Sequence, residues 1–347
     1  MVTLGGDCHK RTHTLVAVDD NGQQLGVKTV FAVQAGHLEA LDWARQWTQR
    51  RWALENCRHL SRRLEADLLS AGELVVQVSP KLMAGARRSA REWGKSDPID
   101  ALAVARAALR ESDLPVARLE GKSREVKLLI DHRDDLVAER TRVQNRLRWH
   151  LHELEPGFHV AERSLDRKVV LKQVRNVLAG HRGVAAGIAV ELLEWVSQQT
   201  ERINALERQI GALVTDLAPT LLELDGCAVL SAAKLIGETA DITRFKTSAR
   251  FAMHNGSAPI PVWSGNAERH RLNRGGNRQL NVVLHRIALT QMRVGGRGYD
   301  YIQHRRASGD TKKEAIRALR RRISDEVYRR MWLDSMRAMN VPAQAAA

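Results

Sequence analysis

The chain has 347 residues, 44% of them hydrophobic, and a formal charge of +15 at pH 7, from 55 lysines and arginines against 40 aspartates and glutamates. Its length suits two or three domains, and its charge predicts a polyanionic partner, nucleic acid before an anionic membrane surface. No run reaches the roughly 18 apolar residues of a membrane span, and there is no signal-peptide core, so we expect a cytoplasmic protein without membrane contact. Three cysteines without CxxC spacing argue against a zinc site and fit a reducing compartment.

The N-terminal part of the chain alternates short apolar runs with helical segments. Strands are predicted over residues 2–7, 13–18, 27–32, 51–55 and 73–78, and helices over 36–49 and 59–71. A turn signal, Asp19-Asp20-Asn21-Gly22, joins the second and third strands into a hairpin. Three antiparallel strands followed by strand, helix, strand predict a mixed sheet that resembles an RNase H-like domain.

Acidic residues end two of these strands. Asp7 ends the first and Glu55 the fourth, and these strands are neighbours in an RNase H-like sheet. Because strand ends in α/β sheets face the ligand crevice, we expect their carboxylates to converge there.

Two further acids, Asp97 and Asp100, open an Ala-rich helix that has Pro98 in its first turn, where Ser96 or Asp97 can cap it. The helix dipole also favours acids there, but capping explains one acid better than two. Four converging carboxylates raise one another's pKa unless a cation neutralises them. Oxygen ligands favour Mg²⁺ or Mn²⁺, and two such ions can flank a phosphodiester during in-line displacement.

Two long helices are predicted in the middle of the chain, over residues 123–155 and 184–217, where apolar residues recur at three- and four-residue steps. They form either a hairpin within the chain or a coiled coil between chains, and we slightly favour the coiled coil. Arg142 and Arg146 lie on a basic face of the first helix, which is either solvated or in contact with phosphates.

The C-terminal part begins at Pro219, which ends the second long helix, and contains a turn at 225–228 like a degenerate helix–hairpin–helix turn. Downstream, Ser264-Gly265 places a hydroxyl on a predicted flexible loop, and Gly275-Gly276 permits close backbone approach before a helix over 277–293. An isolated Ser-Gly is ordinarily a turn, but this one precedes a basic segment. The nucleic-acid contacts predicted there are Arg269, Arg271, Arg274, Asn277 and Arg278.

The last helix is predicted to begin with a capping box at Thr311–Glu314 and to end near Met336. We expect residues 337–347 to form a disordered tail. The predicted division of the chain is therefore 1–115, 116–218, 219–336 and 337–347.

Several blocks of the sequence together resemble the insertion-sequence-110 family of DEDD transposases, also called bridge recombinases. The resemblance runs from Met1 to about Trp332, and two departures from the family pattern are Cys8 and the Gly226-Cys227-Ala228 turn. The blocks are Gly6–Lys10, Leu54–Asn56, Lys95–Ala101, Asn255–Gly265 and Arg274–Leu280.

This resemblance implies a function and an architecture. The fold class it implies is α/β plus α: an RNase H/Holliday-junction-resolvase-like domain, a long helical coiled-coil middle and a mainly helical C-terminal transposase domain. Ser264 corresponds to a serine thought to attack DNA and form a phosphoserine link, with the acidic site of a partner subunit completing the centre. Asp7, Glu55, Asp97 and Asp100 correspond to the tetrad that holds Mg²⁺.

The resemblance also implies partners: donor and target DNA, a guide (bridge) RNA that carries the specificity, and a homo-oligomer in which dimers assemble into a tetramer in the bacterial nucleoid. Two other interpretations remain open. A structure-selective metal-dependent nuclease of the Holliday-junction-resolvase type would need the four acids but not Ser264. A nucleic-acid-binding regulator without catalysis would need neither.

Overall fold

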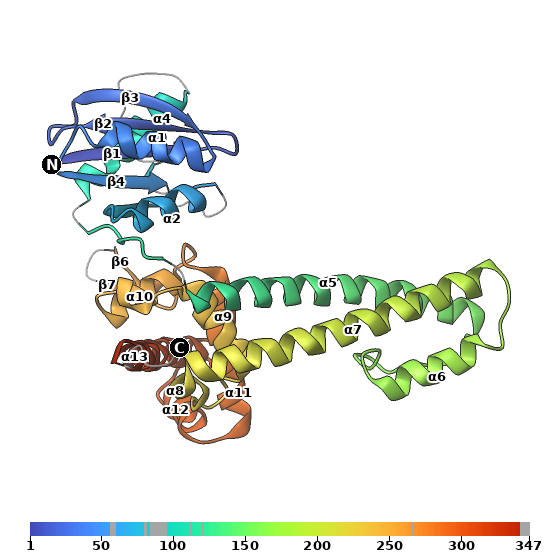
Figure 1. Cartoon of the computed structure of the whole chain (residues 1–347). Coiled ribbons are helices and arrows are strands. Elements are labelled where there is room, and N and C mark those ends of the chain that lie inside the picture. The colour runs from blue at the N-terminus through green and yellow to red at the C-terminus, as the bar shows by residue number, and fades with distance from the viewer. Residues whose placement is uncertain are drawn as a thin grey trace. The chain divides into compact units, whose positions relative to one another are not determined.

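The computed structural model describes residues 1–55, 60–79, 82–83, 96–111, 113–119, 121–264 and 267–340. For residues 264, 267–269 and 340 the description is limited to the backbone. The chain divides into two compact units, Met1–Leu119 and Glu120–Ala347 (Figure 1). The finer division predicted from the sequence stays a prediction.

The N-terminal unit is built on a five-stranded sheet with the order β3-β2-β1-β4-β5. β1 (Val2–Cys8), β2 (Thr12–Val18) and β3 (Gln24–Phe31) form an antiparallel meander. β4 (Arg50–Glu55) runs parallel to β1, and β5 (Val75–Val78) runs parallel to β4. The predicted mixed sheet, with the first and fourth strands as neighbours, is therefore confirmed.

Helices cover both faces of this sheet. α1 (Gln34–Ala44) and α2 (Arg62–Ser70) pack on the face that carries Leu4, Leu15 and Trp52. α4 (Asp97–Arg110) packs on the opposite face, where its alanines meet Val16 and Val18. Because alanine side chains are short, the α4 backbone comes close to the strands.

The second unit begins with two long helices, α5 (Lys122–Leu154) and α7 (Val184–Leu217), which pack along each other within the chain (Figure 1). Val143 and Leu147 of α5 share a core with Leu192 and Val196 of α7. A short helix that the sequence did not predict, α6 (Lys168–Leu178), packs on α7. This packing is the hairpin alternative, and a coiled coil between chains stays a prediction.

The remaining elements of the second unit surround a larger core that includes Phe251, Leu284 and Val327. They comprise helices around one two-stranded ribbon. In chain order they are α8 (Pro219–Leu222), α9 (Val229–Thr239), a 3₁₀ turn (Ile242–Arg244), α10 (Ser248–Asn255), β6 (Ile260–Ser264), β7 (Ala267–Arg271), α11 (Arg278–Val294), α12 (Arg297–Ala307) and α13 (Lys312–Asn340).

The C-terminal helix confirms the predicted capping box and corrects the predicted tail. The Glu314 amide donates to Thr311 Oγ1 at 3.3 Å, and Glu314 Oε2 accepts from the Thr311 amide at 2.8 Å. α13 continues through residues 337–340, which were assigned to the tail, because no glycine or proline interrupts the sequence before Pro342. Residues 341–347 lie outside the described residues.

We expect Gly5→Ala to destabilise the N-terminal unit. A Cβ at Gly5 would collide with the carbonyl oxygen of Ala101 and the amide nitrogen of Ala105, both backbone atoms of α4. Relieving such overpacking costs about 1–3 kcal/mol, which calorimetry would record as a lower melting temperature. Gly187→Ala is the control, because a Cβ there meets nothing within 4 Å and alanine favours the helix. Equal melting temperatures for both variants would contradict the assigned packing of α4 on β1.

Candidate metal centre and nucleic-acid interface

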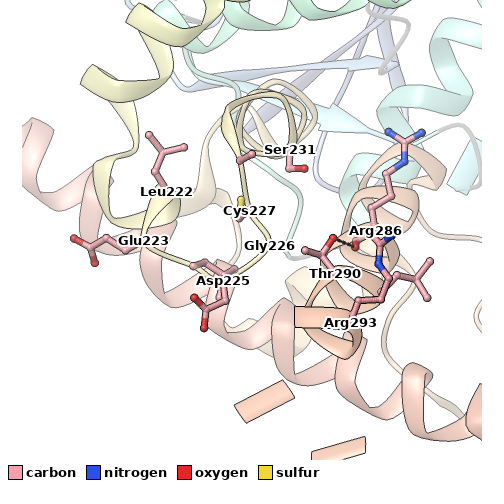
Figure 2. A pocket seen from close by; sticks show the side chains of 12 residues that line it. Leu222, Glu223, Asp225, Gly226, Cys227, Ser231, Arg286, Thr290 and Arg293 are labelled. Carbon is pink, nitrogen blue, oxygen red and sulfur yellow. Dashed lines mark hydrogen bonds between the residues drawn. The ribbon is translucent and has the colours of Figure 1, made fainter. Parts of the chain in front are cut away.

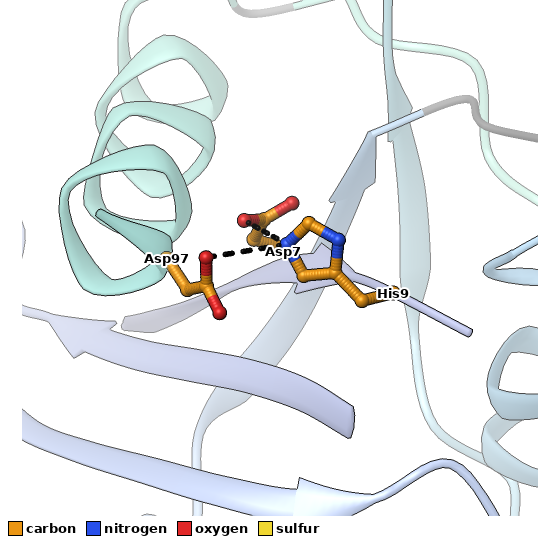
Figure 3. Close-up of side chains that lie close together, drawn as sticks. All are labelled: Asp7, His9 and Asp97. Atoms are coloured by element: carbon orange, nitrogen blue, oxygen red, sulfur yellow. Dashed lines mark hydrogen bonds and ion pairs between the residues drawn. The ribbon is translucent and has the colours of Figure 1, made fainter. Parts of the chain in front are cut away.

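Three side chains that can bind metal meet where β1 ends and α4 begins (Figure 3). Asp7 lies near the end of β1, His9 just past it, and Asp97 is the first residue of α4. One ligand atom from each lies within 4.8 Å of the others. His9 Nε2 is 3.0 Å from Asp7 Oδ2 and 3.4 Å from Asp97 Oδ1.

The other two predicted acids lie near this cluster but outside it. Asp100, in the first turn of α4, is only 8% exposed, and its charge acts on Asp7. Glu55 is the last residue of β4, and the parallel pairing of Gly6 with Leu54 brings it level with Asp7 on the next strand. The sequence therefore placed all four acids in one region, but among the described residues only Asp7 and Asp97 join the ligand cluster.

The predicted capping of α4 is wrong for Ser96. This residue occupies the N-cap position but makes no side-chain hydrogen bond to the helix. Pro98 contributes to this, because as the second helical residue it lacks an N–H and leaves the Ile99 amide as the remaining donor to a cap. The Asp97 carboxylate instead faces His9.

The cluster carries unfavourable negative charge. Burial raises the pKa of Asp7, and the charges of Asp100 and Asp97 raise it further, although the nearby His9 opposes them. Behind the site, burial, together with the neighbouring His37 and His9, lowers the pKa of His13 to about 4, so this imidazole is neutral at physiological pH. A site with acids that lack full compensation suits a bound cation.

His9 is the candidate metal ligand that the sequence analysis missed. Its signal was its position: His9 directly follows the last residue of β1 and is two residues from Asp7, the interval at which a strand's side chains repeat their direction. The expected set of oxygen ligands thus gains an imidazole nitrogen. Imidazole suits transition metals, whereas carboxylates suit Mg²⁺ and Mn²⁺.

In the second unit Ser264 is the last residue of β6, and the expected flexible loop is instead a two-stranded ribbon. The register runs from Ile260 opposite Arg271 to Ser264 opposite Ala267. The sequence contains a signal for a ribbon here, because Gly-Asn, the dipeptide at 265–266, is typical of the connection between two hairpin strands. Gly265 and Asn266 themselves, and the side chain of Ser264, lie outside the described residues.

The segment after the ribbon is fixed to α10 by close contacts. A Cβ at Gly276 would collide with the backbone nitrogen of Gly256, which has φ +74°. The Asn277 amide donates to the His254 carbonyl at 2.6 Å. The predicted close backbone approach is therefore confirmed at Gly276, and the two ends of the ribbon are held together.

Asn277, predicted as a nucleic-acid contact, has structural partners at both ends of its side chain. Its Oδ1 accepts from the Leu280 amide at 3.1 Å and so caps α11. Its Nδ2 donates to Glu238 Oε2 at 2.7 Å. Lys127 pairs with the other oxygen of Glu238 and, together with Asn277, lowers the pKa of that carboxyl against the effect of burial.

The arginines predicted to contact nucleic acid have exposed side chains. Within the described part of the chain they form no ion pair or side-chain hydrogen bond, so their charge is available to a polyanion. They are Arg271, Arg274 and Arg278 near the ribbon and Arg142 and Arg146 on α5. The side chain of Arg269 lies outside the described residues.

The turn at Asp225–Ala228 borders a pocket of about 670 Å³, which Arg286 and Arg293 of α11 also line (Figure 2). Gly226 has φ +81° and packs against the backbone of α11, which explains a glycine there. Burial raises the pKa of Cys227 to about 12, so its thiol is not a nucleophile at neutral pH. Phosphate contact by this turn stays a prediction.

Comparison with known sequences assigns both parts of the chain. Residues 4–156 match the DEDD transposase model of IS110 elements, described as a transposase. Residues 218–303 match a model described as a transposase of the IS116/IS110/IS902 family. The chain belongs to the IS110 family of transposases. This membership makes it an enzyme that acts on DNA.

Relatives from insertion elements align along most of this IS110-family transposase. The uncharacterized 44.8 kDa protein of insertion element IS116 from Streptomyces clavuligerus is 28% identical, over 94% of each chain. The uncharacterized 43.6 kDa protein of IS110 from Streptomyces coelicolor is 28% identical, over 66% of this chain and 69% of its own. The uncharacterized 42 kDa protein of IS900 from Mycobacterium paratuberculosis is 25% identical, over 92% and 93%.

Among solved structures, Thermus thermophilus RuvC in complex with a Holliday junction substrate aligns with 34% of this transposase and 99% of its own chain, at 17% identity and a TM-score of 0.28. A second T. thermophilus RuvC structure aligns at 18% identity with the same TM-score. None of the helices within the described ranges combines the length and the apolar character of a membrane span.

We expect Asp7→Asn to raise the melting temperature of the metal-free transposase at neutral pH, because it removes a buried charge that faces Asp97 and Asp100. The pKa of Asp7 in the folded protein lies above its unfolded value of 3.8. Ionisation of Asp7 therefore lowers the stability of the fold only at pH values above 3.8. The advantage of the variant should therefore shrink as the pH falls toward 3.8.

Calorimetry in EDTA and in Mn²⁺ would test this expectation. Mn²⁺ should stabilise the wild type and leave Asp7→Asn nearly unchanged, because the variant lacks an anionic ligand. Equal stabilisation of both proteins by Mn²⁺ would contradict the assignment of Asp7 as a ligand.

Proposed function

We propose that this transposase is an RNA-guided DNA recombinase that cuts, exchanges and rejoins strands to excise and insert its insertion sequence. In this proposal Ser264 is the nucleophile, and Asp7, Glu55, Asp97 and Asp100 hold Mg²⁺ or Mn²⁺. The observation that carries the proposal is the cluster of Asp7, His9 and Asp97 at the junction of β1 and α4.

The residues at this junction fit a divalent cation. Two carboxylates and an imidazole offer ligand atoms within 4.8 Å of one another, and the raised pKa of Asp7 reflects repulsion that a cation would relieve. Asp100 and Glu55 add carboxylates from the same first turn of α4 and from the adjacent strand. A bound ion would stabilise charge on the attacking and leaving oxygens of a phosphodiester.

The proposed reaction of Ser264 conserves the energy of the DNA backbone. Its Oγ attacks the phosphorus, a serine–phosphate ester forms, and the bond from phosphorus to one sugar oxygen breaks. The Ser264 proton leaves, and the released sugar oxygen gains a proton and becomes a hydroxyl. Attack by a hydroxyl of a second strand reverses these steps and rejoins DNA without ATP.

The support for nucleic-acid partners is electrostatic. The chain carries a net charge of +15, and exposed arginines lie in and after the second strand of the ribbon and on α5. Donor DNA, target DNA and a guide RNA are polyanions that such a surface attracts. Assembly into a dimer and tetramer, with the acids of a partner subunit completing the centre, follows from the family resemblance alone.

The second candidate function is a structure-selective, metal-dependent nuclease of the Holliday-junction-resolvase type. The acid cluster in the RNase H-like sheet favours it, because such a cluster can support hydrolysis without a serine. The two functions differ in whether protein becomes attached to DNA.

We expect a covalent protein–DNA adduct when the transposase is incubated with Mg²⁺, labelled junction DNA of its element and the flanking RNA. A denaturing gel would show the adduct as a slowly migrating labelled band. Ser264→Ala should abolish this band, because the attacking oxygen is gone, and Asp7→Asn should weaken it by about 10²-fold or more, as loss of metal-assisted charge stabilisation does.

Ser308→Ala is the matched control, since it removes an exposed hydroxyl that only bonds the His304 carbonyl, and it should keep the adduct. Free DNA ends without an adduct, unaffected by Ser264→Ala, would overturn the recombinase proposal in favour of the nuclease.

A further inference from the structure

Arg320 of α13 is a buried cation for which the described residues supply no anionic partner. The residue is only 9% exposed. Its Nη1 donates to Asn281 Oδ1 at 3.1 Å, whereas its Nε is buried and has no hydrogen-bond partner among the described residues. Burial lowers the pKa of Arg320, and the charge of Arg317 lowers it further. Because buried charges in proteins are normally paired, this guanidinium calls for an explanation.

The neighbouring arginines of α13 have the partners that Arg320 does not. Arg321 forms an ion pair with Asp325. Arg329 pairs with Glu326 at 2.6 Å. The pairing that accounts for these arginines within the helix therefore does not account for Arg320.

Two hydrogen bonds connect Arg320 to the base of the ribbon. Asn281, which accepts from Arg320, donates through Nδ2 to the carbonyl oxygen of Asn255 at 3.0 Å. The Asn255 side chain donates to Ser324 Oγ of α13 at 2.7 Å. Two residues beyond Asn255, Ser257 Oγ is also buried without a hydrogen-bond partner in the described part of the chain. Unsatisfied polar groups, which are rare in protein interiors, therefore lie where the chain enters the ribbon.

The groups around Arg320 do not compensate its charge. Arg317 lies one turn before it on α13 and adds a second cation. On α11, burial and then the charge of Arg320 lower the pKa of His285. Glu314, the acid that precedes Arg317 in the sequence, is exposed and accepts from Thr311 in the capping box. A ligand that meets this positive charge is an anion.

We propose that Arg320 binds a phosphodiester of a nucleic-acid backbone at the base of the ribbon. The 9% of the residue that stays exposed gives the anion an approach from solvent, and the long stem lets the guanidinium turn toward it. A guanidinium suits this ligand because its planar fork of N–H groups can donate to two phosphate oxygens at once.

This contact would position a strand without reading its sequence, because phosphate contacts fix register and orientation. The inference deepens the proposed function: it rests on the nucleic-acid partners proposed there, but not on the chemistry of Ser264.

The test measures binding of fluorescein-labelled element DNA, and separately of the flanking RNA, by fluorescence anisotropy at several KCl concentrations. All proteins are full-length and carry Ser264→Ala, so that no reaction occurs. We expect Arg320→Met to weaken binding about 10- to 150-fold, the range for a lost hydrogen bond to a charged group. The slope of log K against log salt should become shallower by about 0.7 to 0.9, the value for one phosphate. The two arms show whether DNA or RNA supplies the phosphate.

Neutral linkages in the nucleic acid would locate the contacted phosphate. Methylphosphonate linkages, which carry no charge, are introduced one position at a time into the strand that responds. At one position the neutral linkage should weaken binding to the protein that retains Arg320. The same linkage should change binding to Arg320→Met less than about twofold, because the contact is already lost.

Two further variants separate phosphate binding from a structural role. Arg320→Lys keeps the charge but loses the fork of donors, so it should bind more weakly than arginine and keep the salt slope. Arg329→Gln is the matched control: it removes an equal charge from α13 at a residue that pairs with Glu326, and it should keep both affinity and slope. Arg320→Met should not lower the melting temperature, because it removes a buried charge without an anionic partner.

Unchanged affinity and slope in Arg320→Met with both DNA and RNA would overturn the proposal. An equal loss in Arg329→Gln, or losses that simply add at every methylphosphonate position, would overturn it too. The proposed reaction fails separately. If the chain with Ser264 forms no adduct while Arg320→Met still loses affinity and slope, the phosphate site holds and the serine chemistry does not.

Discussion

The close packing of α4 on β1 determines where the candidate metal centre lies. Gly5 lets the backbone of α4 approach the strand at Ala101 and Ala105, where any side chain would collide. This contact sets Asp97, at the first residue of α4, beside Asp7, near the end of β1. The acids therefore converge because of a backbone contact several residues away from them, and their mutual repulsion is overcome by the packing of the sheet.

A second constraint organises the C-terminal part. The ribbon of β6 and β7 leaves the core after Asn255 and returns before Asn277, and these two points are tied through the His254 carbonyl and through Gly276 against Gly256. Buried polar groups extend this support, since Glu238 joins Asn277 to Lys127 of α5. Two sequence blocks that are separate in the chain thus form one base for the segment that carries Ser264.

The sequence predicted local features better than contacts between distant residues. Alternation and turn signals located the five strands, and the step of apolar residues located α7, because these patterns depend on near neighbours. The sequence could not distinguish the α5–α7 hairpin from a coiled coil, since the same apolar stripe serves either partner. It missed His9 as a partner of Asp97 for a similar reason: that contact depends on how α4 packs. It also missed the ribbon, because β7 carries Glu268 and three basic residues and so lacks the apolar alternation by which a strand is predicted.

The central claim is that the end of β1 and the start of α4 form a divalent metal site. The most direct measurement is anomalous scattering at the manganese absorption edge from crystals of the full chain grown with Mn²⁺. The account predicts an anomalous peak within coordination distance of the Asp7 and Asp97 carboxylates, with His9 Nε2 turned from Asp7 toward the ion. A peak elsewhere in the molecule, or none at a saturating concentration of Mn²⁺, would contradict it.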